Sequence, residues 1–168
     1  MGISKPIENT ILYLNTSTNC IKVNDGTKNY EYTWAISPII LNEYSICKVF
    51  SIAHDASQTA GGAPDESVKH GENIITLRLK DVMINPELYR STDNSGYPIL
   101  HAMPFDSESQ YYDPSLGGLF LTPQTINRIT IIPSDDASKP YNGVNKDITF
   151  IIGLVFQQYD RKYSLTEN

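Results

Sequence analysis

Apolar and polar residues alternate along much of this chain, which is the pattern of β-strands that bury one face. In Tyr30–Ile36 the aromatic and aliphatic side chains fall on one face and the remaining ones on the other, and Asn73–Val82 alternates in the same way. Clusters of Gly, Pro, Asn and Asp separate the apolar runs, as expected of turns between strands. The pattern predicts eight strands: Ile11–Asn15, Cys20–Asn24, Tyr30–Ile36, Ser45–His54, Asn73–Val82, Pro98–Met103, Ile126–Ile132 and Asp147–Phe156.

Single residues predict where strands end or bend. Pro38 is expected to end the third strand and Pro104 the short sixth strand, because proline cannot donate to a sheet ladder. Gly153 interrupts the last strand and predicts a β-bulge or a close backbone approach. Two long loops are expected, Asp55–Gly71 and Phe105–Gly118, and loops of such length are usually functional or mobile.

The fold class follows from the number of strands and the lack of helical patterns. The best helical window, Pro86–Tyr89, provides at most one turn. Strands without helical crossovers exclude a parallel α/β sheet and leave an immunoglobulin-like sandwich, a jelly roll or a barrel. Eight strands favour an all-β fold, a single eight-stranded jelly-roll β-sandwich with long loops. We expect one domain over residues 1–168, with residues 1–9 as an extended N-terminal arm and residues 161–168 as a C-terminal tail.

Composition narrows the classes of function. The net charge of −6 argues against nucleic-acid binding, because a phosphate backbone requires clustered Lys and Arg. No run of about 18 apolar residues exists, so no membrane insertion is expected, and the N-terminus lacks the apolar core of a signal peptide. Cys20 and Cys47 have no partner spacing and are expected to be buried, reduced thiols.

Candidate catalytic and metal-binding groups are few. His54 lies beside Asp55 with Ser51 nearby, but no G-x-S-x-G elbow supports a hydrolase. No H-x-H, H-E-x-x-H or C-x-x-C spacing occurs. A cupin-like enzyme would have to build its ligand cluster from His54 and His101. We therefore expect no enzyme, no catalytic residue, no cofactor and no metal.

Tyrosine is the unusual enrichment, with 11 residues. Tyr111, Tyr112 and Tyr141 lie in polar segments and are predicted as interface or ligand contacts. Exposed tyrosine supplies contact area at a low cost in side-chain entropy and is enriched at protein interfaces. The same side chains could stack on sugar rings, which keeps a lectin-like β-sandwich that binds carbohydrate as an alternative.

Several of the strand sequences resemble a known group. Tyr32–Leu41 followed by Tyr44–Val49 is similar to the early strands of small single jelly-roll capsid proteins of large eukaryotic DNA viruses and their virophages. Ile74–Leu79 and then Ile126–Ile131, with a short Asp-rich turn and a final apolar strand, agree with the later strands. The resemblance extends from Ile11 to Tyr159 and consists of hydrophobic patterns rather than chemical motifs.

The resemblance implies a structural role in a virion. In that family the single jelly roll is the penton, of which five copies close a ring at each five-fold vertex of an icosahedral capsid. Related single jelly rolls are minor capsid or cement proteins, which remain an alternative. The implied partners are further copies of the chain in a homopentamer, a double jelly-roll major capsid protein and other minor capsid proteins. Such a role needs neither a catalytic residue nor contact with nucleic acid.

Overall fold

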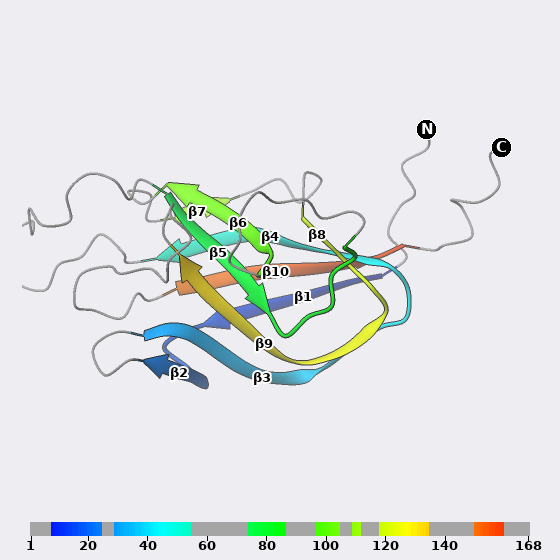
Figure 1. The fold of residues 1–168 in the computed structure, drawn as a ribbon, viewed down its shortest axis with the longest axis horizontal. Coiled ribbons are helices and arrows are strands. Elements are labelled where there is room, and N and C mark those ends of the chain that lie inside the picture. Colours follow the sequence, from blue (N-terminus) through cyan, green and yellow to red (C-terminus); the bar gives the residue numbers. More distant parts are fainter. Residues whose placement is uncertain are drawn as a thin grey trace, which may run out of the picture.

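The computed structural model describes residues 8–24, 29–54, 74–86, 97–104, 109–111, 118–134 and 150–159. These residues form two antiparallel sheets and include no helix (Figure 1). Sheet A contains, in spatial order, β1 (Glu8–Asn15), β10 (Phe150–Gln158) and β4 (Ser45–His54), and β4 also pairs with β7 (Ser109–Tyr111) and β8 (Leu119–Leu121). Sheet B has the order β2 (Cys20–Asn24), β3 (Asn29–Leu41), β9 (Gln124–Ser134), β5 (Ile74–Lys80) and β6 (Ile99–Pro104).

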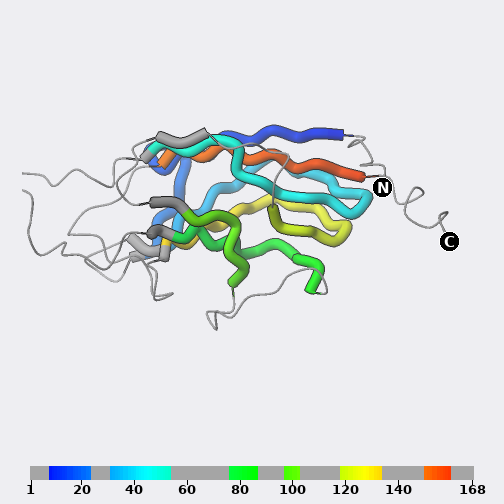
Figure 2. Tube along the Cα trace, turned by 90° about the horizontal axis from the view of Figure 1, so that it is seen from above, coloured from blue at the N-terminus to red at the C-terminus, as the bar shows by residue number. Residues whose placement is uncertain are grey.

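The strand order is that of a jelly roll. The short strands β7 and β8 both pair with β4 and together occupy one position in sheet A, and β2 is an addition at the edge of sheet B. The eight remaining positions then follow the order first, eighth, third, sixth in sheet A and second, seventh, fourth, fifth in sheet B. This arrangement of two Greek keys confirms the predicted fold class. Figure 2 shows the two layers, with β1, β4 and β10 on one side and β5, β6 and β9 on the other.

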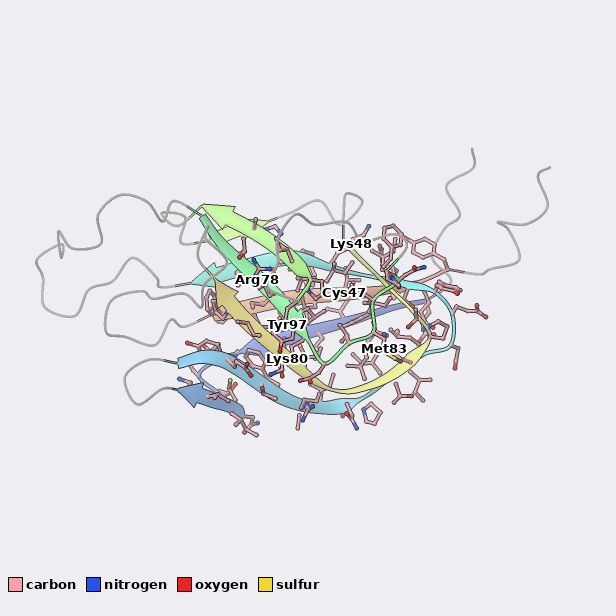
Figure 3. The ribbon with its side chains drawn as sticks, in the orientation of Figure 1. Cys47, Lys48, Arg78, Lys80, Met83 and Tyr97 are labelled. Carbon is pink, nitrogen blue, oxygen red and sulfur yellow. The ribbon has the colours of Figure 1, made fainter. Side chains whose placement is uncertain are left out.

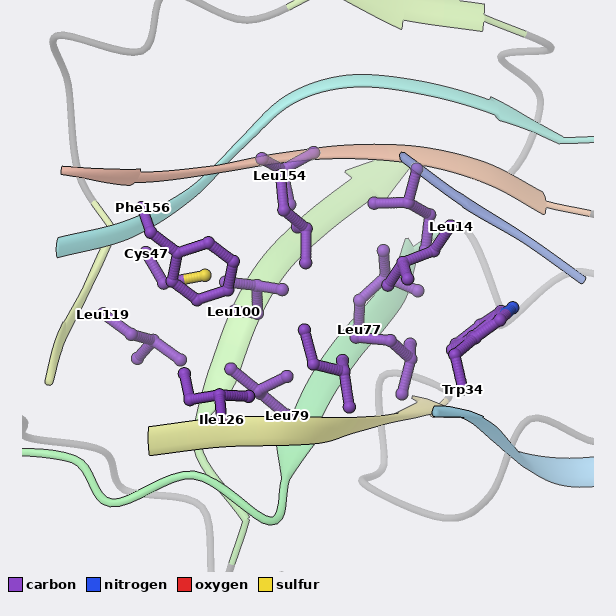
Figure 4. Close-up of a cluster of buried hydrophobic side chains, with 14 of the residues drawn as sticks. Leu14, Trp34, Cys47, Leu77, Leu79, Leu100, Leu119, Ile126, Leu154 and Phe156 are labelled. Carbon is purple, nitrogen blue, oxygen red and sulfur yellow. The ribbon is translucent and has the colours of Figure 1, made fainter. Parts of the chain in front are cut away.

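The core lies between the sheets and is built from alternate residues of their strands. Leu14, Leu154 and Phe156 project into it from sheet A, and Leu77 and Leu79 from sheet B (Figure 4). Each is almost fully buried, and burying a side chain of this size stabilises the fold by about 1.5–3 kcal/mol.

Two aromatic side chains fix the end of the core near β1. The indole Nε1 of Trp34 donates a hydrogen bond of 2.9 Å to the carbonyl of Asn15. The ring of Tyr32 meets that of Phe150 edge to face, with centroids 6.1 Å apart. Strand β3 of sheet B is therefore tied directly to β1 and β10 of sheet A.

Most predicted strands are confirmed, and two prolines that were predicted to end strands lie within strands instead. The segments Cys20–Asn24 and Ser45–His54 were predicted with the bounds that the structure has. Pro38 does not end the third strand, because β3 continues to Leu41. The register between β3 and β9 shifts between Ala35 and Ile39, and β2 pairs only with residues up to Trp34, so Pro38 lies at an irregular, unpaired edge. Proline is tolerated at such positions.

Pro104 likewise lies within a strand, as the last residue of the edge strand β6. The sequence pattern missed β7, which falls inside the predicted loop Phe105–Gly118, and β8, which follows it directly. Three-residue strands are too short to show a periodicity. The predicted bulge at Gly153 is confirmed by a shift in the register between β10 and β4.

The closing strands β9 and β10 lie in different sheets, so they are not paired with each other. Strand β1 begins at Glu8, inside the range 1–9 predicted as an arm. Residues 1–7, 161–168 and the predicted loop Asp55–Gly71 lie outside the described residues.

Candidate interaction surface

Each sheet has an outer face that points away from the core, and the two outer faces differ in chemistry. On sheet A, the register places Ile11 opposite Val155, and Tyr13 opposite Gly153. We call the A face the outward apolar residues of this sheet: Ile11, Tyr13, Ile46, Phe50, Phe120, Ile151 and Val155. Four of them are large and well exposed, with 61% of Ile11, 63% of Tyr13, 40% of Phe120 and 45% of Ile151 accessible to solvent. A group of exposed apolar residues of this kind marks a surface for interaction.

An aromatic pair lies at the centre of the A face, and Gly153 makes room for it. The rings of Tyr13 and Phe50 meet edge to face with centroids 5.5 Å apart. A Cβ atom at Gly153 would lie 2.6 Å from Cζ of Phe50 and 2.5 Å from Oγ of Ser51, closer than real Cβ atoms approach. The lack of a side chain at Gly153 therefore lets Phe50 lean over β10 toward Tyr13. Aromatic side chains that cover a sheet glycine in this way also stabilise the local pairing.

The outer face of sheet B is polar over β9 and β5, while Ile21, Val23 and Ile40 expose apolar side chains on β2 and β3. We call the B face its outward charged and hydroxyl-bearing residues: Glu31, Thr33, Arg78, Lys80, Asp81, Arg128 and Thr130. The Lys80 ammonium lies 3.1 Å from both carboxylate oxygens of Glu31 and 5.6 Å from the ring centroid of Tyr97. The hydrogen bond to Glu31 raises the pKa of Lys80 above its ordinary value.

A second part of the B face is a chain of hydrogen bonds across three segments. The hydroxyl of Thr130 lies 2.9 Å from that of Thr33 and donates to Oδ2 of Asp81 at 2.6 Å. The other oxygen of Asp81 accepts from Nη2 of Arg128 at 3.0 Å. Asp81 has a φ of 68°, a left-handed conformation that Asp and Asn tolerate better than most residues. This conformation occurs directly after β5 ends and brings the carboxylate onto the face of β9.

Arg78 is the most buried charged residue of the B face, with only 2% of its surface exposed. Its Nη1 donates to the carbonyl of Tyr97 at 3.1 Å. Figure 3 shows Arg78, Lys80 and Tyr97 close together along β5. The B face is thus occupied by its own contacts, whereas the A face presents apolar groups to solvent.

The structure places only part of the tyrosine set predicted as contacts. Tyr111 is the last residue of β7 and pairs with Ser51, so its position in the sheet falls in the same row as Gly153 and Tyr13. Tyr112 and Tyr141 lie outside the described residues.

The two histidines considered for a cupin-like centre lie on strands of different sheets, His54 at the end of β4 and His101 on β6. Burial lowers the pKa of His101. Within the described ranges, no three His, Cys, Asp or Glu side chains are grouped so that they could hold a metal ion. His54 and His101 are therefore not on adjacent strands of one sheet, which is the arrangement that a cupin-like ligand cluster would need.

Both cysteines are free, as predicted. Cys47 is fully buried in the core, and burial raises the pKa of its thiol to about 12. Cys20 on β2 is only half-buried, so the prediction of two buried thiols is wrong for this residue, although burial also raises its pKa. Neither thiol has the exposed, low-pKa setting of a reactive cysteine.

Sequence reasoning missed the A face, although a signal was present. In β1, Ile11, Leu12, Tyr13 and Leu14 are apolar in succession, so the strand has apolar side chains on both faces. Leu12 and Leu14 face the core, while Ile11 and Tyr13 are exposed. In an antiparallel sandwich, one face of a strand packs on the core and the other is normally polar. A strand that is apolar on both faces therefore indicates that its outer face is also covered, by another part of the chain or by a partner.

No protein-family model matches this chain, and no curated protein is similar to it in sequence. Among the described residues, no helix has the length and apolar character needed to cross a membrane.

Proposed function

We propose that this protein is a structural capsid protein and that five copies form the penton at each five-fold vertex of an icosahedral virion. The observation that carries the proposal is the jelly-roll strand order, in which β1 lies beside β10 and the chain crosses repeatedly between the two sheets. Jelly rolls of this type are common in viral capsids. The resemblance of the strand sequences to small single jelly-roll capsid proteins supports the same role.

The contrast between the two outer faces is consistent with a subunit of an assembly. A ring of five uses a heterologous interface, in which one flank of each copy meets the opposite flank of the next. The A face offers Ile11, Tyr13 and Ile151 for burial against a neighbouring copy or a double jelly-roll major capsid protein. The B face already uses its charges internally and has less to gain from a partner.

The test is to locate the protein in particles. The protein would be tagged and its positions determined by electron microscopy of purified virions, while light scattering and negative-stain images follow the free protein. We expect density at the five-fold vertices and rings with five times the 18.8 kDa mass of the chain. Density only between vertices would contradict the penton role and favour a minor or cement capsid protein.

A second candidate function is carbohydrate binding, as in a lectin-like β-sandwich. The observation that favours it is the exposed ring of Tyr13, held edge to face by Phe50, with Ser51 as a polar neighbour. An aromatic face beside hydroxyl groups is suited to a sugar ring. A broad glycan array with the wild type, Tyr13→Ala and substitutions of Tyr111, Tyr112 and Tyr141 would test it. A lack of signal on the array would exclude this function.

A further inference from the structure

Among the strands that the structure describes, β1 lies at an edge of sheet A, and the hydrogen-bonding groups on its outer side can be assigned. The N–H of Thr16 donates to the carbonyl of Phe150 at 3.0 Å. Because backbone groups alternate in direction along a strand, Leu14, Leu12 and Thr10 also direct their N–H and C=O groups toward β10. The corresponding groups of Asn9, Ile11 and Tyr13 therefore point away from β10. In the part of the chain that the structure describes, no strand pairs with β1 on that side.

The β1 edge lacks the features that usually prevent edge pairing. Strand β1 is eight residues long, contains neither Pro nor Lys, and keeps an unbroken register from Glu8 to Asn15. The other edge strands are different. Strand β2 has five residues, carries Lys22 and has a register shift. Strand β6 ends in Pro104 and also has a register shift, and β7 and β8 have three residues each.

The open stretch of this edge is limited at one end. The carbonyl of Asn15 already accepts hydrogen bonds from Nε1 of Trp34 at 2.9 Å and from the N–H of Thr18 at 3.2 Å. The available groups are therefore those of Asn9, Ile11 and Tyr13. The outward side chains of Ile11 and Tyr13 are 61% and 63% exposed, so a strand added here would cover apolar surface and also form backbone hydrogen bonds.

We propose that the β1 edge binds β1 of a second copy of this chain, antiparallel, about a two-fold axis at Leu12. In this register Ile11 lies opposite Tyr13 of the second copy, and Tyr13 lies opposite Ile11 of the second copy. Both pairs exchange two backbone hydrogen bonds, because their N–H and C=O groups point to the edge. Aromatic and β-branched residues are favourable cross-strand neighbours on one face. The two A sheets then form one continuous sheet.

The charge carried by strand β1 does not oppose a second copy as the occupant. Each chain has a net charge of −6, which disfavours close approach in general. Strand β1 carries one charged residue, Glu8, at its first position. Its carboxylate accepts a hydrogen bond from Nε2 of Gln158 at 3.0 Å. In the proposed register, Glu8 lies opposite Thr16 of the second copy, so the two carboxylates are at opposite ends of the paired strands.

The pairing goes beyond the ring contact proposed above and does not depend on it. A two-fold interface is isologous and closes at two copies, whereas a five-fold ring uses a heterologous interface. Both contacts can exist in one assembly, as two rings joined through their β1 edges.

The first test compares two lysine substitutions by analytical ultracentrifugation of the full chain. Ile11 and Ile21 have almost equal exposure, 61% and 64%, and lie on edge strands of different sheets. We expect wild-type dimers and a dimer affinity at least about tenfold weaker for Ile11→Lys, because it places a charge within the paired edge. Ile21→Lys should behave as the wild type. The proposal would be overturned if the wild type were monomeric or if the two substitutions had equal effects. It would also be overturned if Ile11→Lys still formed five-fold rings and no dimer joined through β1 were found.

The second test reads the register. Residues opposite each other in a non-hydrogen-bonded antiparallel pair have Cα atoms about 4.5 Å apart, which a disulfide can span. Leu12→Cys should therefore cross-link to a dimer with oxidised glutathione, whereas Ile11→Cys should not, since Tyr13 of the second copy lies opposite it. The wild type, with Cys20 and Cys47, provides the baseline. Cross-linking of Leu12→Cys no faster than the wild type would exclude this register, while the penton role is judged separately by position in particles.

Discussion

The A face and the B face differ in whether their side chains find partners within the chain. On the B face, Lys80 pairs with Glu31, and Asp81 connects Arg128 with Thr130. On the A face, Ile11, Tyr13 and Ile151 are large, apolar and exposed. The B face therefore stabilises the subunit, while the A face is available to stabilise an assembly. Substitutions on the B face should change the unfolding free energy, and those on the A face should mainly change association.

The largest effect is expected for Arg78 on the B face. Arg78→Ala removes a side chain that is 2% exposed, together with the hydrogen bond that it donates to the Tyr97 carbonyl. We expect the unfolding free energy to fall by about 3 kcal/mol, from lost packing and a lost charge-assisted hydrogen bond. Urea unfolding followed by the fluorescence of Trp34, the single tryptophan, measures it.

The matched control is Arg128→Ala on the same face. The Arg128 side chain is 59% exposed, and its ion pair with Asp81 is open to solvent. Exposed ion pairs contribute less than about 1 kcal/mol. Equal losses of unfolding free energy for Arg78→Ala and Arg128→Ala would show that the burial of Arg78 adds no stability. The conclusion that the B face stabilises the subunit would then be wrong.

The second prediction concerns Gly153, which shapes the A face. Gly153→Ala would bring a Cβ atom within 2.6 Å of Phe50 Cζ, so the ring must move away from Tyr13. We expect a loss of about 1–3 kcal/mol from this overpacking. The double substitution Gly153→Ala with Phe50→Ala should lose less than the sum of the single ones, because the clash with the Phe50 ring is gone while that with Ser51 Oγ remains. Strict additivity in urea unfolding would contradict the proposed contact between these residues.

The sequence predicted the B face better than the A face, for a physical reason. In β5, Thr76, Arg78 and Lys80 alternate with the buried residues Leu77 and Leu79. This alternation predicts both the strand and the polar character of its outer side. In β1 and β10 apolar residues occupy both faces, and alternation then carries no information about which side is exposed. The Tyr13–Phe50 contact depends on a register that joins β1, β10 and β4, which no local pattern encodes.

Proline and short strands account for two further errors in the predicted fold. Pro38 predicts a strand end, but the third strand continues past it and has a neighbour on only one side at that point. Whether a strand has one neighbour or two is set by distant segments, so the sequence alone could not show that proline is tolerated there. The three residues of β8 pair with Ser45–Cys47, and only that pairing identifies them as a strand.

The third prediction separates backbone conformation from charge at Asp81. Its φ of 68° favours Asp, Asn or Gly, and its carboxylate accepts from Thr130 and Arg128. Asp81→Ala loses the side chain that tolerates this conformation and both hydrogen-bond acceptors, so it should lower the unfolding free energy by about 2 kcal/mol. Asp81→Asn keeps the tolerated conformation and one acceptor, so its loss should be about half as large. If the two variants were equally stable in urea unfolding, the left-handed conformation would contribute nothing at this position.

The smallest effect is the pH dependence of the Lys80–Glu31 pair. The pKa of Lys80 is raised in the folded protein above the ordinary lysine value of 10.5, first by its hydrogen bond to Glu31. The stabilisation by the Lys80–Glu31 pair is therefore fully present below about pH 10.5, and it is lost as the pH rises through the pKa of Lys80 in the folded protein. The pair is partly exposed, so solvent screening limits it to less than about 1 kcal/mol.

Glu31→Gln serves as the reference for this pH dependence, because tyrosines ionise in the same range. The wild type should exceed Glu31→Gln in unfolding free energy near neutral pH. The difference should shrink toward zero as the pH rises above 10.5 and through the raised pKa of folded Lys80, where its ammonium loses the charge. A difference that stays constant across this range would mean that the charge of Lys80 does not stabilise the fold. In that case buried groups such as Arg78, and not the surface ion pairs, would account for the stability that the B face contributes. The A face and the B face would then differ in how deeply their side chains are buried and not in how they are paired.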